Sequence, residues 1–202
     1  MTTFSDLNSL CPVSNSMQYL ADRDDNKYID ILLIRYPNKT SKLLQFITGS
    51  YFTHASIGLG DFAGIFYSLI SKGFRLEEPY KHPSFKGKEV PCRLYRLKVS
   101  VEVYERIRHN LEYHVEQSEN YKYSYIGLLL CILHISLKLE NRYFCSQFVS
   151  EVLECAKAAK LKKDSVLYLP DDFMYEKDLR LQFSGTLRNL IAARTTFLSA
   201  CS

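Results

Sequence analysis

The sequence predicts an α+β fold, with strands dominating the first half of the chain and helices the second. Runs of apolar and β-branched residues at 28–35, 52–59 and 92–99 are typical of strands, and the last two alternate between apolar and polar side chains. From residue 103 onward, the apolar residues recur instead at the spacing that places them on one face of a helix. A chain of 202 residues, 47% of them hydrophobic, is long enough to build one domain with a sizeable core.

The first half of the chain is expected to hold one short helix among its strands. After a turn at Pro37, Thr40 or Ser41 can cap a helix, and Gly49 suits the left-handed backbone that ends one. The expected elements are a polar lead-in at 1–27, strands at 28–35, 52–59, 65–70, 74–76 and 92–99, a helix at 42–47, and a proline-rich loop at 77–91.

The second half is predicted to be mainly helical. Asn141 is an acceptable cap for the helix that begins near Cys145. The longest apolar run, 126–139, is about 14 residues long, whereas a membrane span needs roughly 20. The expected elements are helices at 103–115, 126–138, 145–159 and 171–175, then a hairpin of strands at 179–183 and 186–190. A single domain over 28–190, followed by a tail at 191–202, is therefore predicted.

Composition and charge exclude several classes of function. The net charge is +4, with both signs scattered along the chain, so a nucleic-acid partner is not expected. The six cysteines form no CxxC pair and offer, with the five histidines, no zinc-ligand spacing, so we expect neither a metal nor another cofactor. The N-terminus lacks the basic start and apolar run of a signal peptide. We therefore expect a cytoplasmic protein with reduced thiols and no transmembrane segment, and leave its oligomeric state open.

One cysteine lies where its thiol can be reactive. Cys145 begins a predicted helix, on the side that also carries Phe148, Val149 and Val152. At the N-terminus of a helix, unpaired backbone N–H groups and the positive end of the dipole favour the thiolate, which is the nucleophilic form. The alternative is a buried thiol that only fills space in the core, as most cysteines on apolar helix faces do.

A histidine far upstream can serve as the base for such a thiol. His54 lies on the predicted strand 52–59, on the face that it shares with Ser56 and Gly58. An imidazole beside Cys145 would take the thiol proton, hold the thiolate as an ion pair and later protonate the leaving group. Sequence separation is no objection, because such partners meet only in the fold.

A third polar group normally fixes the orientation of such an imidazole. It is expected on the strand that returns after His54, where Ser68 is the polar candidate and the predicted third catalytic residue. Asp61, Glu77 and Glu78, at the strand ends, are the alternatives. A carboxylate would serve better than a serine, because it also stabilises the imidazolium ion.

Longer segments around His54 and Cys145 extend this pattern. They are SKLLQFITGSYFTHASIGLG at 41–60 and YFCSQFV at 143–149, accompanied by IDILL, YSYIGLL and LPDDF, which begin at residues 29, 123 and 169. Over roughly residues 28–185, these segments resemble the circularly permuted NlpC-type, papain-like cysteine hydrolases (the YiiX/YebB-like group). The order of histidine before cysteine, the reverse of ordinary papain-like enzymes, marks the permutation.

This resemblance implies a permuted papain-like fold, in which a small antiparallel sheet forms a partial barrel packed on the nucleophile helix. It implies Cys145 as nucleophile, His54 as base and a third residue, often glutamate or a second histidine, on the strand after His54. The aligned position is Ser68, which is neither, so this chain departs from the family there. The residues expected to contact substrate lie within these segments: Thr53, Tyr125 and Tyr143.

Relatives of this kind cut amide bonds as peptidases and amidases, or act on lipids as acyltransferases and phospholipase-like enzymes related to lecithin:retinol acyltransferase. All attack an acyl carbon with a thiolate and pass through an acyl-enzyme. The resemblance therefore implies a cysteine hydrolase that cleaves a peptide or an amino-acid amide. A lipid-directed enzyme is one alternative, which the apolar stretch 126–138 favours. A non-catalytic binding module on the same fold is the other, which Ser68 favours.

Overall fold

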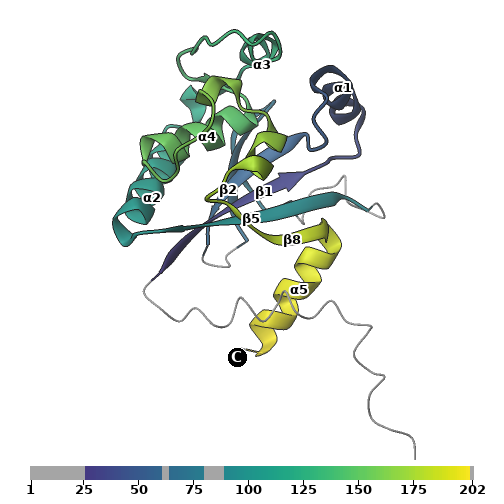
Figure 1. The fold of residues 1–202 in the computed structure, drawn as a ribbon, viewed down its shortest axis with the longest axis vertical. Coiled ribbons are helices and arrows are strands. Elements are labelled where there is room, and N and C mark those ends of the chain that lie inside the picture. The colour runs from purple at the N-terminus through teal and green to yellow at the C-terminus, as the bar shows by residue number, and fades with distance from the viewer. Residues whose placement is uncertain (1–25, 61–63, 80–88, 201–202) are drawn as a thin grey trace, which may run out of the picture.

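A six-stranded antiparallel sheet forms the centre of the protein (Figure 1). The computed structural model describes residues 26–60, 64–79 and 89–200. The strand order along the sheet is β4-β3-β2-β1-β5-β8, and each neighbouring pair is antiparallel. The strands are β1 (Lys27–Ile34), β2 (His54–Leu59), β3 (Phe66–Ile70), β4 (Gly73–Glu77), β5 (Pro91–Val99) and β8 (Arg180–Thr186). The predicted α+β class and its first five strands are confirmed.

β1 lies inside the sheet because both of its faces are apolar. Ile29, Ile31 and Leu33 belong to one buried cluster, whereas Leu32 and Ile34, which alternate with them, belong to another. A continuous apolar run of this kind is typical of a strand that is covered on both sides. The sheet therefore separates two apolar layers.

Helices cover the sheet on both sides, but most of them gather on one. Figure 1 shows α2, α3 and α4 above the sheet and α5 beyond β8 below it. The helices are α1 (Lys39–Thr48), α2 (Val101–Glu116), α3 (Tyr125–Ile132), α4 (Cys145–Cys155) and α5 (Leu187–Ala200). Shorter elements complete the fold: the 3-10 helices η4 (Ser118–Asn120), η5 (Ser165–Leu167) and η6 (Pro170–Tyr175), and the parallel pair β6 (Lys122–Tyr123) and β7 (Arg142–Tyr143).

Three apolar clusters hold these layers together. The largest joins the sheet to α2 and α4, and includes Ile107 and Phe148. The second lies on the opposite face of the sheet and takes in Leu187 at the start of α5. The third joins α3 to the start of α4, and Leu44 of α1 packs against it beside Leu128. Cys145 thus begins a helix that is fixed between the first and third clusters.

The short helix α1 is capped at both ends, although not by the residues that the sequence suggested. Asn38, rather than Thr40 or Ser41, is the N-cap, and its side chain accepts the backbone N–H of Ser41 at 2.7 Å. Gly49 ends the helix in the left-handed conformation, at φ 69°, as predicted.

Left-handed backbone explains why two other helices are shorter than predicted. α3 ends at Ile132 instead of 138, and His134 follows with φ 56°. α4 ends at Cys155 instead of 159, and Lys157 follows with φ 54°. Asn141, the predicted cap of α4, also has a positive φ, and Phe144 occupies the cap position instead. A right-handed helix cannot continue through such residues.

The predicted C-terminal hairpin is wrong. One continuous strand, β8, pairs with β5, and its Gly185 lies opposite Cys92 instead of in a turn. A Cβ atom at Gly185 would lie 2.9 Å from the ring of Phe183, so close packing within the strand accounts for this glycine. α5 then runs across the predicted boundary between the domain and the tail. Nearly all of the lead-in 1–27 lies outside the described residues.

The apolar run at 126–138 does not form a long helix. Only Tyr125–Ile132 is helical, and the residues that follow are turn and irregular backbone. Among the helices that the structure describes, none combines the length and the hydropathy that a membrane span requires.

Candidate active site

Cys145 is the first residue of α4, and its side chain is buried against β2. The helix packs on this strand because Ala55 and Ile57 share an apolar cluster with Phe148. The imidazole of His54 and the backbone N–H groups of Ala55 and Ser146 lie beside the Cys145 sulfur, where hydrogen bonding from them lowers the pKa of the thiol. The structure thus brings together the cysteine and the histidine that the sequence singled out.

The first two turns of α4 are fixed by serines, and no side chain caps the helix. The hydroxyl of Ser146 donates to the carbonyl of Tyr168 at 2.7 Å, and that of Ser150 reaches the carbonyl of Ser165 at 3.1 Å. Both serines are buried, so these bonds tie the helix to the segment around η5. The position of the Cys145 sulfur is therefore defined by contacts on two sides of the helix.

His54 opens β2, directly after the loop that leads out of α1. The carboxylate of Asp171, in η6, accepts the backbone N–H groups of Tyr51 and Phe52, the latter at 2.9 Å. These two bonds fix the residues just before His54. Asp171 lies in the LPDDF segment noted in the sequence, and this contact gives that segment a structural role beside the site.

The side chain that pairs with the His54 imidazole is Glu77 and not Ser68. The Nε2 atom of His54 lies 2.8 Å from Oε2 of Glu77, and both side chains are largely buried. Ser68 lies mid-strand opposite Arg75, and its hydroxyl has no hydrogen-bond partner among the described residues. The prediction for the third residue is corrected accordingly. Of the other candidates, Glu78 directly follows Glu77, and Asp61 lies outside the described residues.

The electrostatics of the buried pair favour a thiolate and an imidazolium. Burial lowers the pKa of His54, but the charge of Glu77 and hydrogen bonds to Cys145 and Glu77 outweigh it and raise that pKa to about 10. Burial raises the pKa of Cys145, but the hydrogen bond and the charge of His54 lower it below its ordinary value. Because Nε2 of His54 faces Glu77, Nδ1 is left for the sulfur.

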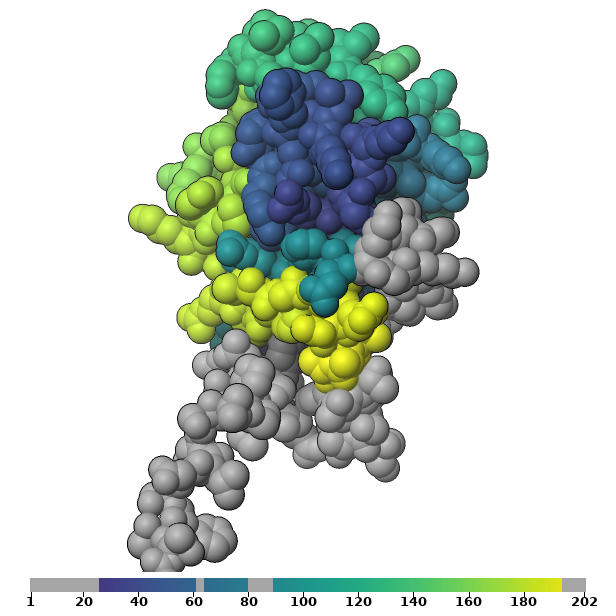
Figure 2. Space-filling view, turned by 90° about the vertical axis from the view of Figure 1, so that its right-hand side faces the viewer, coloured from purple at the N-terminus to yellow at the C-terminus, as the bar shows by residue number. Residues whose placement is uncertain are grey.

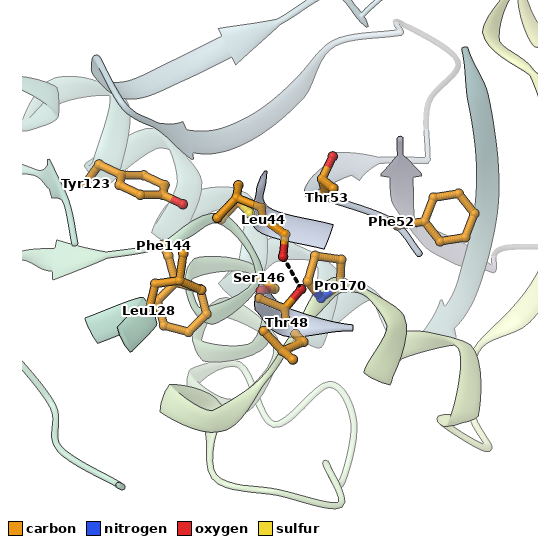
Figure 3. A pocket seen from close by; sticks show the side chains of 11 residues that line it. Leu44, Thr48, Phe52, Thr53, Tyr123, Leu128, Phe144, Ser146 and Pro170 are labelled. Carbon is orange, nitrogen blue, oxygen red and sulfur yellow. Dashed lines mark hydrogen bonds between the residues drawn. The ribbon is translucent and has the colours of Figure 1, made fainter. Parts of the chain in front are cut away.

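A small apolar pocket opens beside the sulfur. It encloses about 280 Å³ of empty space, part of it open to solvent. Figure 3 shows Leu44, Tyr123 and Leu128 around one part of the pocket, with the hydroxyl of Tyr123 turned towards Leu44. A water-sized sphere can occupy only about 20 Å³ of this space, so the site beside Cys145 is a narrow recess that a bound group would have to widen.

The three predicted substrate contacts have different surroundings. Thr53 lines the pocket, and its hydroxyl accepts the backbone N–H of Tyr36 at 3.4 Å. Tyr143 is instead buried in the core, where burial and then Glu151 raise its pKa. Tyr125 is exposed at the start of α3, outside the residues that line the pocket. Of the three, only Thr53 is therefore placed to touch a group bound there.

Two tyrosines near the sulfur were not foreseen. The ring of Tyr36 lies 5.4 Å from that of His54, and burial, Glu77 and Cys145 together raise its pKa. Tyr123 lines the pocket, and burial followed by the charge of Cys145 raises its pKa as well. Both phenols therefore stay protonated and can donate a hydrogen bond. Tyr123 lies in the YSYIGLL segment, which was the available signal for it.

The described residues contain no cluster of three or more histidine, cysteine or carboxylate side chains arranged to hold a metal ion. No protein-family model and no curated protein matches this chain. The chemistry must therefore be inferred from the geometry of the Cys145 site.

Proposed function

We propose that the protein is a cysteine hydrolase that cleaves an amide through a thiolate acyl-enzyme. The arrangement of Cys145, His54 and Glu77 carries this proposal: a buried thiol at a helix N-terminus, hydrogen-bonded to an imidazole whose far nitrogen meets a carboxylate. This is the order of nucleophile, base and orienting group that acyl transfer requires.

The proposed reaction has two halves. The Cys145 sulfur forms a bond to the carbonyl carbon, and the carbonyl electrons move to its oxygen. When the intermediate collapses, the C–N bond breaks, and the departing amine takes the proton of the His54 imidazolium. Water then attacks the thioester carbon while His54 accepts its proton, and collapse of this second intermediate breaks the C–S bond. The carboxylic acid departs, and the Cys145 thiolate and the His54 imidazolium are restored. Glu77 orients the imidazole and stabilises its charged form throughout.

The start of α4 supports stabilisation of the negative oxygen. The first backbone N–H groups of a helix have no partner within the helix itself, and the N–H of Cys145 is one of them. In the proposed mechanism this N–H, with a neighbouring donor, binds the oxyanion. The protonated hydroxyl of Tyr36 or Tyr123 is a candidate for the neighbour.

The fold is consistent with the family that the motifs resemble. An antiparallel sheet packed on the nucleophile helix is what a permuted papain-like hydrolase of the NlpC type would have. A glutamate as third residue also matches that family, although it comes from β4 and not from the position of Ser68. The hydrogen bond between Cys145 and His54 supports an enzyme over a binding module.

A lipid ester is the second candidate substrate. Apolar side chains dominate the lining of the pocket, among them Leu44, Leu128, Phe144 and Leu169. The apolar character of this lining suits an acyl chain once the recess opens to admit it, and the chemistry at Cys145 would be unchanged. The small acyl end of a peptide or amino-acid amide would require less widening of the recess than a long acyl chain.

A thiolate nucleophile must remain reduced, which favours a reducing cellular compartment. Cys92, Cys131, Cys145 and Cys155 are free thiols. Such side chains stay reduced in a reducing environment. We accordingly propose that the enzyme acts in the cytoplasm.

Labelling by a thiol-directed acyl probe tests the proposed nucleophile. We expect the wild type to be labelled rapidly near neutral pH and Cys145→Ala to lose nearly all of that labelling, because Cys145 alone has a lowered pKa among the four cysteines that the structure describes. Cys155→Ala, which removes an exposed thiol, is the matched control and should label as the wild type does. Equal labelling of the wild type and Cys145→Ala would refute the proposal.

A further inference from the structure

Large exposed hydrophobic side chains are concentrated in two segments that also contribute residues to the lining of the pocket. Sixteen such residues occur in the described part of the chain, and ten of them fall within 43–51 and 125–137. The most exposed of all is Phe46 on α1, at 88%. The ten are Leu43, Phe46, Ile47, Tyr51, Tyr125, Ile126, Leu129, Leu133, Ile135 and Leu137.

The two segments form one surface. Leu44 of α1 packs against the cluster that Leu128 and Cys131 of α3 form with Phe144, so both segments border the same apolar cluster. The same two residues line the pocket at Cys145. Figure 2 shows the α1 region directly beside the green residues that include α3. We call this surface, the outward-facing residues of 39–51 and 125–138, the apolar rim.

The charge of these segments is entirely positive. Residues 35–60 contain Lys39 and Lys42 but no aspartate or glutamate, and residues 121–139 contain Lys122 and Lys138 but no acidic residue either. Lys39, Lys42 and Lys122 are exposed, while Lys138 pairs with Glu151 at 2.6 Å. Acidic side chains from other segments reach the edge of this surface: Asp171 accepts the backbone N–H of Tyr51, and the exposed Asp164 accepts the hydroxyl of Ser136. The positive charge of the surface therefore comes from the exposed Lys39, Lys42 and Lys122 within its own segments.

We propose that the apolar rim seats on the surface of an anionic lipid bilayer, with the pocket of Cys145 facing the membrane. Apolar side chains that project singly, as Phe46 does, can enter the boundary between headgroups and acyl chains, while nearby lysines bind the anionic headgroups. A second copy of this chain fits less well, because two such faces would bring like charges together. This inference does not depend on which bond the enzyme cleaves.

Flotation with vesicles tests the apolar part of the rim. With vesicles of equal amounts of phosphatidylcholine and phosphatidylserine, we expect the full chain to float, and Phe46→Ser or Leu129→Ser to weaken binding at least about tenfold. Leu181→Ser is the matched control, because Leu181 is similarly exposed on β8, away from the rim. Circular dichroism of each variant verifies that it is folded.

The same assay tests the charge. Lys39→Gln with Lys42→Gln should reduce binding to the anionic vesicles about 25-fold, since each surface lysine contributes about fivefold. Lys98→Gln with Lys160→Gln, two exposed lysines outside the rim, should have little effect. Binding of the wild type should fall as salt is raised and should be weak on pure phosphatidylcholine.

Several outcomes would overturn the proposal. These are no flotation of the wild type, equal losses in rim and control variants, or binding that ignores the vesicle charge. A rim-dependent dimer that forms without lipid and excludes vesicles would identify the occupant as a second copy instead. Cys145→Ala should bind vesicles as the wild type does, so a failure of the catalytic proposal remains distinct from a failure of this one.

Discussion

At the scale of single residues, the position of Glu77 explains how a buried histidine can remain charged. His54 and Glu77 are both largely buried and 2.8 Å apart, so little water screens their attraction. The sequence indicated Cys145 and His54, because their flanking segments are distinctive. It could not choose among Ser68, Asp61, Glu77 and Glu78, because the choice depends on how the strands β3 and β4 fold back towards the start of β2.

Replacing Glu77 with glutamine should show this dependence in the pH profile. The active ion pair requires His54 to be protonated, so activity should extend to alkaline pH and fall as the pH passes about 10, where His54 loses its proton. At acid pH, activity should fall where Cys145 gains a proton. That limit should lie below the ordinary pKa of a thiol, because the pKa of Cys145 is lowered. Glu77→Gln keeps the size of the side chain but removes its charge, so the alkaline limit should move down.

The size of the effect is expected to be about 10- to 100-fold in kcat/KM. The measurement is kcat/KM against pH for the wild type, Glu77→Gln and Ser68→Ala. Ser68→Ala should keep the wild-type alkaline limit, because Ser68 does not contact the imidazole. An unchanged limit in Glu77→Gln would show that the carboxylate does not hold the charge of His54.

At the scale of elements, strands were predicted better than helix ends. The run Ile29–Leu33 and the alternation in β2 and β5 identify strands directly, because burial on a sheet imposes its period on the sequence. The ends of α3 and α4 depend on left-handed residues such as His134 and Lys157, which carry no strong turn signal. Ser184 and Gly185 were mistaken for a turn, because only the pairing with β5 reveals that they lie within a strand.

The pairing of β1 with β5 also contains a buried ion pair that matters for stability. Asp30 lies opposite Arg96, and the two side chains form two hydrogen bonds, at 2.7 and 2.8 Å. Asp30→Ala should lower the free energy of unfolding by about 3–5 kcal/mol, because it leaves the guanidinium buried without this partner. The double variant Asp30→Leu with Arg96→Met should lose less, since neither charge remains.

Urea denaturation of these variants measures the difference. Glu102→Ala is the matched control: it breaks an exposed ion pair with Arg106 on α2 and should change stability by less than about 1 kcal/mol. A loss in Asp30→Ala no larger than in this control would mean that the buried pair does not couple the two strands.

At the scale of the whole molecule, the fold brings a strand and a helix that are about 90 residues apart in sequence to one point, where His54 meets Cys145. The hydrophobic periodicity of the sequence predicted the α+β class, and the segments around His54 and Cys145 predicted that these two residues lie together. They could not predict the apolar rim, because an apolar run such as 126–138 has the same composition whether it is buried or exposed. In the structure, α3 ends at Ile132, and much of the apolar run around and after that point is exposed.

The acyl-enzyme is the most direct test of the central claim that Cys145 is an activated nucleophile. Intact-mass and peptide-mapping spectrometry after incubation with an activated acyl ester should find one acyl group, attached to Cys145, that accumulates and then turns over in the wild type. His54→Ala should slow its formation by at least about a hundredfold. An adduct that maps to the exposed Cys155, or that forms at Cys145 equally fast without His54, would contradict the account.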